Sequence, residues 1–499
     1  MSDIEFEKSL AVRETPIKGL LVVEVPVHGD SRGWFKENWQ REKMCALGAP
    51  DLRWVQNNIS YNAKRGVTRG IHAEPWDKWI SVAAGRIFGA WVDLREGSDT
   101  YGKTFTCELD PSRAILTPRG VGNSFQALED GTVYTYLVNA HWSAELKKTY
   151  TFVNLADPAL AIEWPIPLSE CELSQADRTH PFLKDVVPMG PKRTLVTGSN
   201  GQLGRAVRAL AESRGVARWF DFTDRSRFDF TDLSDYGKID WSLYGAVINC
   251  AAYTSVDAAE SLDGRVACWK ANAMGPSLLA KTCAEHGIVL VHVSSDYVFD
   301  GECESHDEDE PFGPLGVYGQ AKAAGDLAVV GCPSHYIIRS SWVIGDGDNF
   351  VRTMATLSNR CVDPSDSLNH VTVVNDQFGR LSFASDMAQG IFWLLGYHEG
   401  DIEPTEPCQF GTYNLTSSGS TASWAEIAAL VFKKCNDNAE AVLPVSTADY
   451  YANKQGPISP RPVNSTLDLT KIENTGFAPR GWETALDDYL TDLIVAAGK

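Results

Sequence analysis

The stretch Thr194-Leu-Val-Thr-Gly198-Ser-Asn-Gly201-Gln-Leu-Gly204 decides the fold of most of this 499-residue chain. An apolar run of strand type leads into three glycines at three-residue spacing, and residues of helical type follow. A turn of this kind lets the backbone approach a pyrophosphate group, which rests on the N-terminus of the helix. We therefore expect a dinucleotide-binding α/β domain that starts at residue 194.

The residues before this stretch must fold by themselves, and a chain of this length predicts two or three domains. Pro188-Met-Gly-Pro191 has the composition of a linker. We predict a first domain over residues 1–187, a linker over 188–193 and a second domain over 194–499.

Composition and charge exclude several classes of protein. A net charge of −20 argues against general nucleic-acid binding, which needs clustered Lys and Arg. No apolar run long enough for a membrane span is present, and the acidic N-terminus lacks a signal-peptide core. The eleven cysteines show no Cys-x-x-Cys and indicate reduced thiols in the cytosol. We expect a cytoplasmic protein without a metal site, and we interpret the charge run Glu302 to Glu310 as a solvated loop.

In the second domain, apolar strands alternate with helical stretches, which is typical of a parallel sheet. Twenty residues past Gly204 stands Asp224-Arg225. Asp224 suits a ribose hydroxyl and Arg225 a 2′-phosphate, so NADH and NADPH both remain open. The small residues Ala251 and Ala252 would let the cofactor lie close to a strand end. The expected cofactor-binding residues are Gly198, Asn200, Gly201, Gln202, Leu203, Gly204, Asp224, Arg225, Ala251, Ala252, Tyr253, Tyr318 and Lys322.

The strongest catalytic signal lies downstream of this site. Ser295 ends a buried strand, and Tyr318 and Lys322 open a helix at i and i+4, on one helix face. We expect the Lys322 ammonium to lower the pKa of the Tyr318 phenol. Tyr318 would then donate a proton to a carbonyl oxygen held by Ser295, while a nicotinamide supplies hydride to the carbon.

Residues 193 to 499 resemble the extended short-chain dehydrogenases, and further segments narrow the resemblance to the dTDP-4-dehydrorhamnose reductases. Those segments include Ser294-Ser-Asp-Tyr-Val-Phe-Asp-Gly301, Arg339-Ser-Ser-Trp342-Val, Asn375-Asp376-Gln377-Phe-Gly379 and Arg461-Pro462-Val-Asn464-Ser465. The resemblance implies a Rossmann fold with a small substrate-binding subdomain. It also implies that Trp342 and Asn349 line the substrate site and that Arg461 assists it.

The first domain contains short β-type runs separated by turn residues, which predicts an antiparallel sandwich or barrel. Polar clusters interrupt these runs: Gly29-Asp-Ser-Arg32-Gly33-Trp34-Phe35-Lys-Glu37, Val55-Gln56-Asn57-Asn58-Ile-Ser60 and Gly66-Val-Thr-Arg69-Gly70-Ile-His72. From about Val27 to Leu183 the order of these clusters resembles the dTDP-4-dehydrorhamnose 3,5-epimerases. That family implies a cupin-type jelly roll.

The resemblance also implies site residues in the first domain. His72 would be the base, oriented by Asp177, and Lys78 would lie near the oxygen of the developing enolate. The nucleotide and sugar would be bound by Arg32, Glu37, Gln56, Asn58 and Arg69.

Two positions depart from the epimerase family. Trp142 stands where the family has a tyrosine acid, and Asn123 stands where it has a histidine. Water, His141 or Tyr136 would then have to supply the proton. Epimerisation at two carbons, epimerisation at one carbon and binding without turnover all remain open.

Together the two resemblances imply a bifunctional enzyme. The first domain would convert dTDP-4-keto-6-deoxy-D-glucose to its C3/C5 epimer, and the second would reduce the C4 ketone with NADPH or NADH to give dTDP-L-rhamnose. The alternatives are a reductase with a non-catalytic binding or dimerisation module, and a second domain that only binds nucleotide. We expect a homodimer; the base of the nucleotide and the final sugar stay open.

Overall fold

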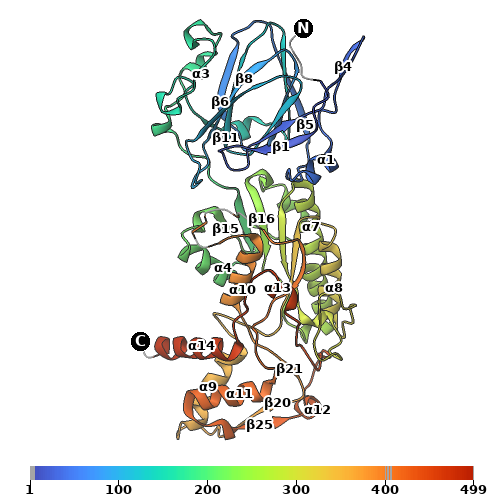
Figure 1. The fold of residues 1–499 in the computed structure, drawn as a ribbon. Helices are drawn as coiled ribbons and strands as arrows, with labels where there is room; N and C mark the ends of the chain where they lie inside the picture. Colours follow the sequence, from blue (N-terminus) through green and yellow to red (C-terminus); the bar gives the residue numbers. More distant parts are fainter. Residues whose placement is uncertain (1–5, 399, 402–403, 405–406, 498–499) are drawn as a thin grey trace. The chain divides into compact units, whose positions relative to one another are not determined.

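The computed structural model describes residues 6–398, 400–401, 404 and 407–497. The chain divides into two compact units, Met1–Pro191 and Lys192–Lys499 (Figure 1). Each unit has its own sheets and its own apolar core. Among the described residues, no helix is both long and apolar enough to cross a membrane.

Unit 1 is built mainly from antiparallel strand pairs in two sheets. The first sheet has the order β1 (Ala11–Glu14), β2 (Leu21–Glu24), β10 (Arg113–Thr117), β7 (Lys78–Ala84), β12 (Thr132–Val138) and β5 (Gln56–Asn62). The second has the order β13 (Thr151–Phe152), β6 (Thr68–Ala73), β11 (Val121–Ala127), β8 (Ile87–Asp93) and β9 (Thr104–Leu109). A short helix α2 (Ala144–Lys147) lies between β12 and β13 in the chain, and another, α3 (Gln175–Arg178), follows β13.

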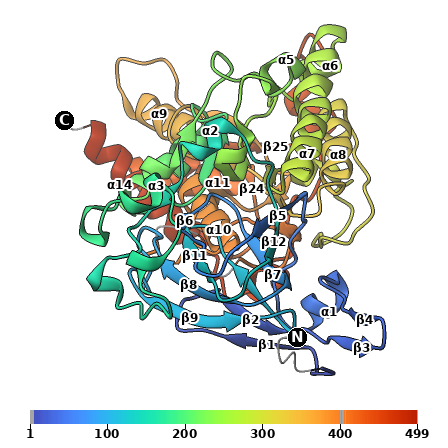
Figure 2. The same cartoon turned by 90° about the horizontal axis from the view of Figure 1, so that it is seen from above.

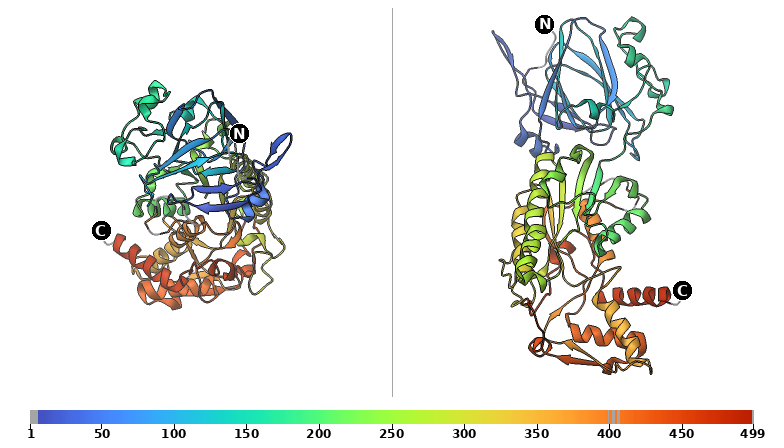
Figure 3. Two further views of the ribbon diagram at one scale, coloured as in Figure 1. Left: turned by 45° about the horizontal axis from the view of Figure 1, so that its top comes forward. Right: turned by 180° about the vertical axis from the view of Figure 1, so that it is seen from behind.

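A hairpin of β3 (His28–Asp30) and β4 (Gly33–Phe35) belongs to neither sheet. It projects from the two sheets of unit 1 (Figures 2 and 3), whereas the nearby helix α1 (Arg41–Ala46) packs through Met44 against Trp79 and Leu116 of the six-stranded sheet. Most side chains of the hairpin are therefore exposed.

The inner faces of the two sheets pack on each other. Side chains alternate along a strand, so Ile80 and Val82 of β7 point to the same face and meet Phe125 of the other sheet in one core cluster. Lys78, two residues before Ile80, continues this inner face, and its ammonium reaches Asn123 of the opposite sheet. The inner face is thus apolar along most of its length and polar at one end.

A β-bulge turns Arg69 and His72 of β6 to this same inner face. Phe125 lies opposite Arg69 and Asn123 opposite His72, so β6 has one residue more than β11 between the two pairs. Gly70 lies in the bulge with a φ of +117°, and a Cβ there would stand 2.5 Å from the Cβ of Ser124. Glycine is therefore required at this position.

Unit 2 is organised around a parallel sheet. Its order is β15 (Phe220–Phe222), β14 (Arg193–Thr197), β16 (Tyr244–Asn249), β17 (Val289–Val293), β18 (His335–Arg339) and β23 (Gly411–Asn414). One face is covered by α4 (Gln202–Ser213) and α10 (Ala384–Leu395), and the other by α7 (Gly275–His286) and α8 (Val317–Val329) (Figure 1). Because both faces are covered, the strands are nearly continuous apolar runs.

The strand order determines where a ligand can bind. The chain places β15 on one side of β14 and β16 on the other, so the order reverses beside β14. In open α/β sheets, ligands bind at the carboxyl ends of the strands at such a reversal.

A smaller part of unit 2 has its own apolar core. Its helices are α9 (Phe350–Val362), α11 (Trp424–Asn436) and α14 (Trp482–Ala497), and its main strand pair is β20 (Val371–Val374) with β25 (Val442–Val445). A capping box of Ser423 and Glu426 starts α11. Further short elements are α5 (Leu233–Tyr236), α6 (Leu262–Trp269), α12 (Thr447–Tyr451), α13 (Thr470–Glu473), β19 (Val343–Ile344), β21 (Phe378–Gly379), β22 (Ser382–Phe383) and β24 (Ala422–Ser423).

Candidate active sites

A cavity of about 720 Å³ opens in unit 2 at the carboxyl ends of β14, β16 and β17. Of the thirteen residues expected to bind a cofactor, every one except Gly204 lines this cavity. Val293, Ser294, Val343 and Met387 add to its wall. The structure thus gathers residues that lie far apart in the sequence at the point where the strand order reverses.

The glycine turn explains why Gly204 does not line the cavity. Gly198 has a φ of +63°, and a Cβ there would stand 2.6 Å from the backbone nitrogen of Ala251. A Cβ on Gly204 would stand 2.4 Å from the carbonyl oxygen of Gly198. Gly198 therefore keeps the floor of the cavity open, whereas Gly204 allows α4 to pack against the turn.

Asp224 and Arg225 lie at the rim of the cavity. Hydrogen bonds from Ser226 lower the pKa of Asp224, so this carboxylate is ionised at neutral pH. It also accepts a hydrogen bond from the side chain of Asn200 at 3.1 Å. Arg225 is exposed and pairs with Asp229 at 3.1 Å. The rim thus offers both a carboxylate and a guanidinium to a ribose.

Tyr318 and Lys322 are buried side by side on α8. The ammonium of Lys322 donates to the carbonyl oxygen of Val293 at 2.7 Å, and burial lowers its pKa to about 8. Ser295 lies within hydrogen-bonding reach of Tyr318 and donates to Oδ1 of Asp296 at 2.9 Å.

The expectation that Lys322 lowers the pKa of Tyr318 is wrong for this arrangement. Burial raises the pKa of the phenol, and the neighbouring Asp296 raises it further. Lys322 does not offset this, because its ammonium is directed at the Val293 carbonyl and is paired electrostatically with Asp326. Tyr318 is consequently held in its protonated form, the form that can donate a proton.

Asp296 is a site residue that the sequence reasoning missed. It is buried, burial raises its pKa to about 6, and hydrogen bonds from Ser465 and Ser295 oppose this shift. Its position directly after Ser295 was visible in the sequence. What the sequence did not indicate is that this carboxyl group is fully covered and adjoins Tyr318.

The three expected substrate residues of unit 2 lie outside the described cavity. Trp342 stacks on Trp424 with ring centroids 3.7 Å apart. Asn349 caps α9 and donates to the hydroxyl of Tyr489 at 2.7 Å, so its side chain is occupied in local structure. Arg461 pairs with Asp257 at 2.9 Å.

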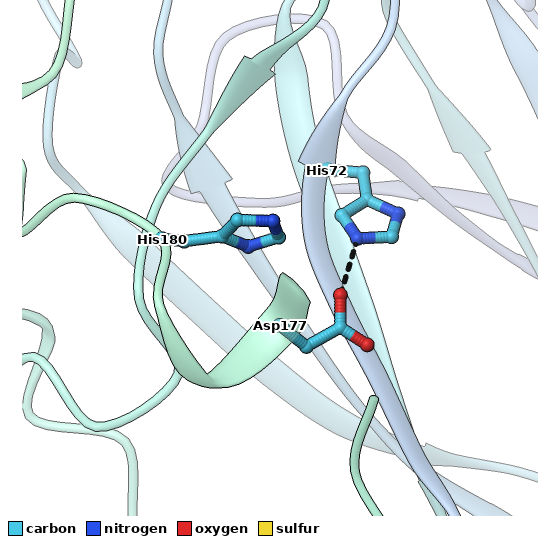
Figure 4. A group of neighbouring side chains, drawn as sticks. All are labelled: His72, Asp177 and His180. Atoms are coloured by element: carbon cyan, nitrogen blue, oxygen red, sulfur yellow. Dashed lines mark hydrogen bonds and ion pairs between the residues drawn. The ribbon is translucent and has the colours of Figure 1, made fainter. Parts of the chain in front are cut away.

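In unit 1, His72 and Asp177 form a hydrogen-bonded pair. Nε2 of His72 lies 2.8 Å from Oδ1 of Asp177, and His180, in the loop that follows α3, lies beside the same pair (Figure 4). Burial raises the pKa of Asp177, but the hydrogen bond and charge of His72 outweigh it and hold that pKa below its usual value. The carboxylate therefore stays ionised and fixes the orientation of the imidazole.

Lys78 is placed on the same inner face. Its ammonium is 2.7 Å from Glu74 and 2.6 Å from the side-chain oxygen of Asn123, which lies opposite His72 in the neighbouring strand. Burial lowers the pKa of Lys78, and Glu74 partly offsets this. Asn123 therefore links the lysine to the strand that carries the His72 pair.

Three of the expected binding residues, Gln56, Asn58 and Arg69, also lie on the inner face. Gln56 donates to Asn58 at 2.9 Å on β5, and Arg69 donates to Asn62 at 3.4 Å. Arg32 and Glu37 are not brought there: both are exposed on or beside the β3–β4 hairpin, where they pair with Asp30 and Lys43.

The structure also shows where Trp142 and the two alternative proton donors, Tyr136 and His141, lie. The backbone N–H of Trp142 donates to Gln56 at 3.0 Å, while its side chain is 53% exposed. Tyr136 points inward, with its ring 5.4 Å from the Lys78 ammonium, and burial raises its pKa to about 12. His141 is exposed.

Two family models match the chain. The one described as "RmlD substrate binding domain" matches residues 192–495, and the one described as "dTDP-4-dehydrorhamnose 3,5-epimerase" matches residues 14–185. The "Protein RmlC homolog" of Streptococcus pyogenes is 50% identical over 198 residues, which are 38% of this chain and 99% of that protein.

Two further relatives match unit 2. The dTDP-4-dehydrorhamnose reductase of Aggregatibacter actinomycetemcomitans is 35% identical over 304 residues, which are 59% of this chain and 97% of that protein. The crystal structure of dTDP-4-dehydrorhamnose reductase from Bacillus anthracis in complex with NADP is 29% identical, with a TM-score of 0.51, over 60% of this chain and 99% of that one. Both resemblances drawn from the sequence are confirmed. The chain therefore belongs to the RmlD reductase family through residues 192–495 and to the dTDP-4-dehydrorhamnose 3,5-epimerase family through residues 14–185.

Proposed function

We propose that this protein is a bifunctional enzyme of deoxysugar-nucleotide synthesis. Residues 1–187, as a cupin-type jelly roll, epimerise dTDP-4-keto-6-deoxy-D-glucose at C3 and C5. Residues 194–499, as a Rossmann domain with a substrate-binding subdomain, reduce the C4 ketone with NAD(P)H to give dTDP-L-rhamnose. The observation that carries the proposal is that one chain holds both the His72–Asp177 pair and Tyr318 with Lys322 at a dinucleotide-sized cavity.

In the epimerase reaction, the C4 ketone acidifies the C–H bonds at C3 and C5. His72, held by ionised Asp177, removes the proton, and the buried Lys78 ammonium stabilises the oxygen of the resulting enolate. A second group returns a proton to the opposite face. Tyr136, whose ring lies 5.4 Å from the Lys78 ammonium, is one candidate for this role, and His141 or water are the others.

In the reductase reaction, the residues present fit a nicotinamide dinucleotide. Gly198 leaves room where any side chain would meet Ala251, and the rim residues Asp224 and Arg225 suit a ribose with or without a 2′-phosphate. The bound cofactor supplies hydride to C4. Ser295 holds the carbonyl oxygen, and Tyr318, kept protonated by its burial, donates the proton that completes the alcohol.

Fusion of the two activities has a chemical reason. The ketone that makes the C3 and C5 protons acidic is the group that the second site removes. Reduction therefore draws the epimerisation equilibrium forward, and the tether keeps both sites at a high effective concentration for a dissociating intermediate.

We further propose that unit 1 forms a homodimer through exposed apolar groups of its β3–β4 hairpin and of the edge strand β5. Phe35 of the hairpin is exposed, and so are Ile59 and Tyr61 of the edge strand β5. Exposed apolar groups beside an unpaired strand edge are a pairing surface. A second copy would also explain why Arg32 and Glu37 stand apart from the His72 pair: each hairpin would serve the site of the partner.

Complementation between two inactive variants tests the assignment. His72→Ala and Tyr318→Phe, each supplied with dTDP-4-keto-6-deoxy-D-glucose and NADPH, should form no dTDP-L-rhamnose, whereas their mixture should form it. Product from His72→Ala alone would contradict the assignment of His72 as the base. Absence of dTDP-L-rhamnose with the wild type and with the mixture would favour the alternative that the N-terminal domain only binds sugar nucleotide, which the Trp142 and Asn123 departures suggested.

A further inference from the structure

The loop between Asp296 and α8 holds a cluster that the proposed reactions do not use. Sγ of Cys303, a ring nitrogen of His306 and a carboxylate oxygen of Glu310 all lie within 4.8 Å of one another. The charge run Glu302 to Glu310 predicts a solvated loop, and no metal site is expected there. Most of this segment is indeed exposed, but the His306 side chain is fully buried.

His306 is fixed firmly in place. Its ring stacks on Phe299 with centroids 4.8 Å apart, and its backbone N–H donates to Thr466 at 2.9 Å. The side-chain amide of Asn464 donates to the carbonyl oxygens of Cys303 at 2.8 Å and Glu304 at 2.7 Å. The same segment thus holds both the cysteine and the histidine, so the cluster does not depend on a freely moving loop.

The hydrogen bonds of the His306 ring favour a cation beside Nδ1. Nε2 lies 3.1 Å from the carbonyl oxygen of Asn464, which can only accept, so Nε2 carries a proton. In the neutral ring, the lone pair of Nδ1 then faces the carboxylate of Glu310 at 2.9 Å, and two acceptors oppose each other. A second ring proton or a metal ion would resolve this conflict.

Two further observations favour the metal ion. First, an imidazole whose other nitrogen donates to a backbone carbonyl is the usual arrangement of a metal-binding histidine. Second, residues 300–310 contain no Lys or Arg and seven carboxylates, which favours a cation near the cluster. Those carboxylates are Asp300, Glu302, Glu304, Asp307, Glu308, Asp309 and Glu310. The Arg339 guanidinium reaches this segment from β18 and donates to the carbonyl oxygen of Glu308 at 3.0 Å.

We propose that Cys303, His306 and Glu310 bind a divalent transition metal of the zinc type. A set of one sulfur, one nitrogen and one oxygen donor suits zinc, whereas Mg²⁺ and Ca²⁺ prefer oxygen alone. Tetrahedral zinc separates its sulfur and nitrogen ligands by about 3.6 Å, so the ligand atoms need to close by about 1 Å at most. Water or a neighbouring carboxylate completes the coordination.

The site would be structural. It ties the loop that leads from Asp296 to the helix of Tyr318 and Lys322 onto the segment of Asn464 and Ser465. It takes no part in the proposed reactions, and its test does not depend on them.

Cobalt substitution of the full chain tests the proposal. Titration of the protein with Co²⁺ should give one equivalent of tight binding with a thiolate-to-cobalt charge-transfer band in the near ultraviolet, and Zn²⁺ should abolish the band. Cys303→Ser should lose the band, and Glu310→Gln should bind at least about tenfold more weakly. Both changes lie outside the apolar core, so folding is expected to persist. Cys45→Ser is the matched control, because Cys45 also adjoins a carboxylate, Asp51.

Three results would overturn the proposal. One is the absence of any cobalt binding by the wild type, which leaves His306 and Glu310 in direct contact without a metal ion. Another is a band that persists in Cys303→Ser or is lost in Cys45→Ser. The third is cobalt binding without a thiolate band, which would place the ion elsewhere, for example on His72, Asp177 and His180.

Discussion

Replacing Asp177 with asparagine probes the catalytic pair of unit 1 most sharply. The carboxylate side chain is 7% exposed and its oxygen lies 2.8 Å from Nε2 of His72. Asparagine keeps the size of the side chain but removes the charge that stabilises the imidazolium formed when His72 takes a proton. A hydrogen bond to a charged group contributes about 1.5–3 kcal/mol, which corresponds to a rate lower by about 10- to 150-fold.

The assay is deuterium incorporation at C3 and C5 of dTDP-4-keto-6-deoxy-D-glucose in D2O, followed by NMR without NAD(P)H. Asp157→Asn is the matched control, because Asp157 is also buried in unit 1 but holds the backbone of Ala159 and Leu183 instead of His72. Reduction of an already epimerised substrate by unit 2 should be unchanged in both variants. Exchange within about twofold of the wild type in Asp177→Asn, or equal slowing in Asp157→Asn, would refute the reasoning.

The other predictions concern unit 2. Tyr318→Phe should abolish reduction while NADPH binding, followed by fluorescence titration, stays within about twofold; residual turnover near the wild-type rate would exclude Tyr318 as the proton donor. Gly198→Ala should weaken NADPH binding by about tenfold or more, because its Cβ would meet Ala251 at 2.6 Å. Gly215→Ala, also at positive φ but with open space, should cost about 1–2 kcal/mol of stability and leave binding unchanged. Equal binding by the two alanine variants would contradict the role of the turn. Burial raises the pKa of Asp296 to about 6 from a usual 3.8, so its contribution to stability is present below about pH 4 and is lost as the pH rises through 6. The melting temperature of Asp296→Asn should therefore rise relative to the wild type between pH 4 and pH 7, by the equivalent of about 3 kcal/mol at most; a pH-independent difference would show that Asp296 is not buried as described.

For unit 2, most of the site residues could be predicted from local sequence patterns. The i, i+4 spacing of Tyr318 and Lys322 depends on one turn of helix, and the glycine turn has a fixed local spacing, so both can be read directly from the sequence. The pKa of Tyr318 was not predictable in this way. It depends on burial and on Asp296, whose carboxyl group is covered by a segment more than 160 residues away at Ser465.

In unit 1, by contrast, local sequence patterns predict little of the site. His72 and Asp177 are 105 residues apart, and no periodicity indicates that they touch. The resemblance supplied the pair, and the bulge at Gly70 shows how Arg69 and His72 come to share a face despite their odd spacing. The same resemblance placed Arg32 and Glu37 in the site without indicating that they lie on a separate hairpin. Asn349 was assigned to substrate for the same reason, although an asparagine directly before a helix is a local capping signal.

The interpretation of residues 302–310 as a solvated loop failed at one residue. Charge density predicts exposure for a run of carboxylates, and most of the run is exposed. The burial of His306 arises from its contacts with Phe299, Asn464 and Thr466. Two of these partners lie more than 150 residues further along the chain, where pattern reasoning does not reach.

The central claim is that both sites act in turn on the same ketone. The direct measurement is to incubate the wild-type protein with dTDP-4-keto-6-deoxy-D-glucose in D2O, then add NADPH and determine the product by NMR. Our account predicts dTDP-L-rhamnose that carries deuterium at both C3 and C5. A reduced product without deuterium at these carbons, with deuterium at C3 alone, or with the unepimerised configuration would contradict it.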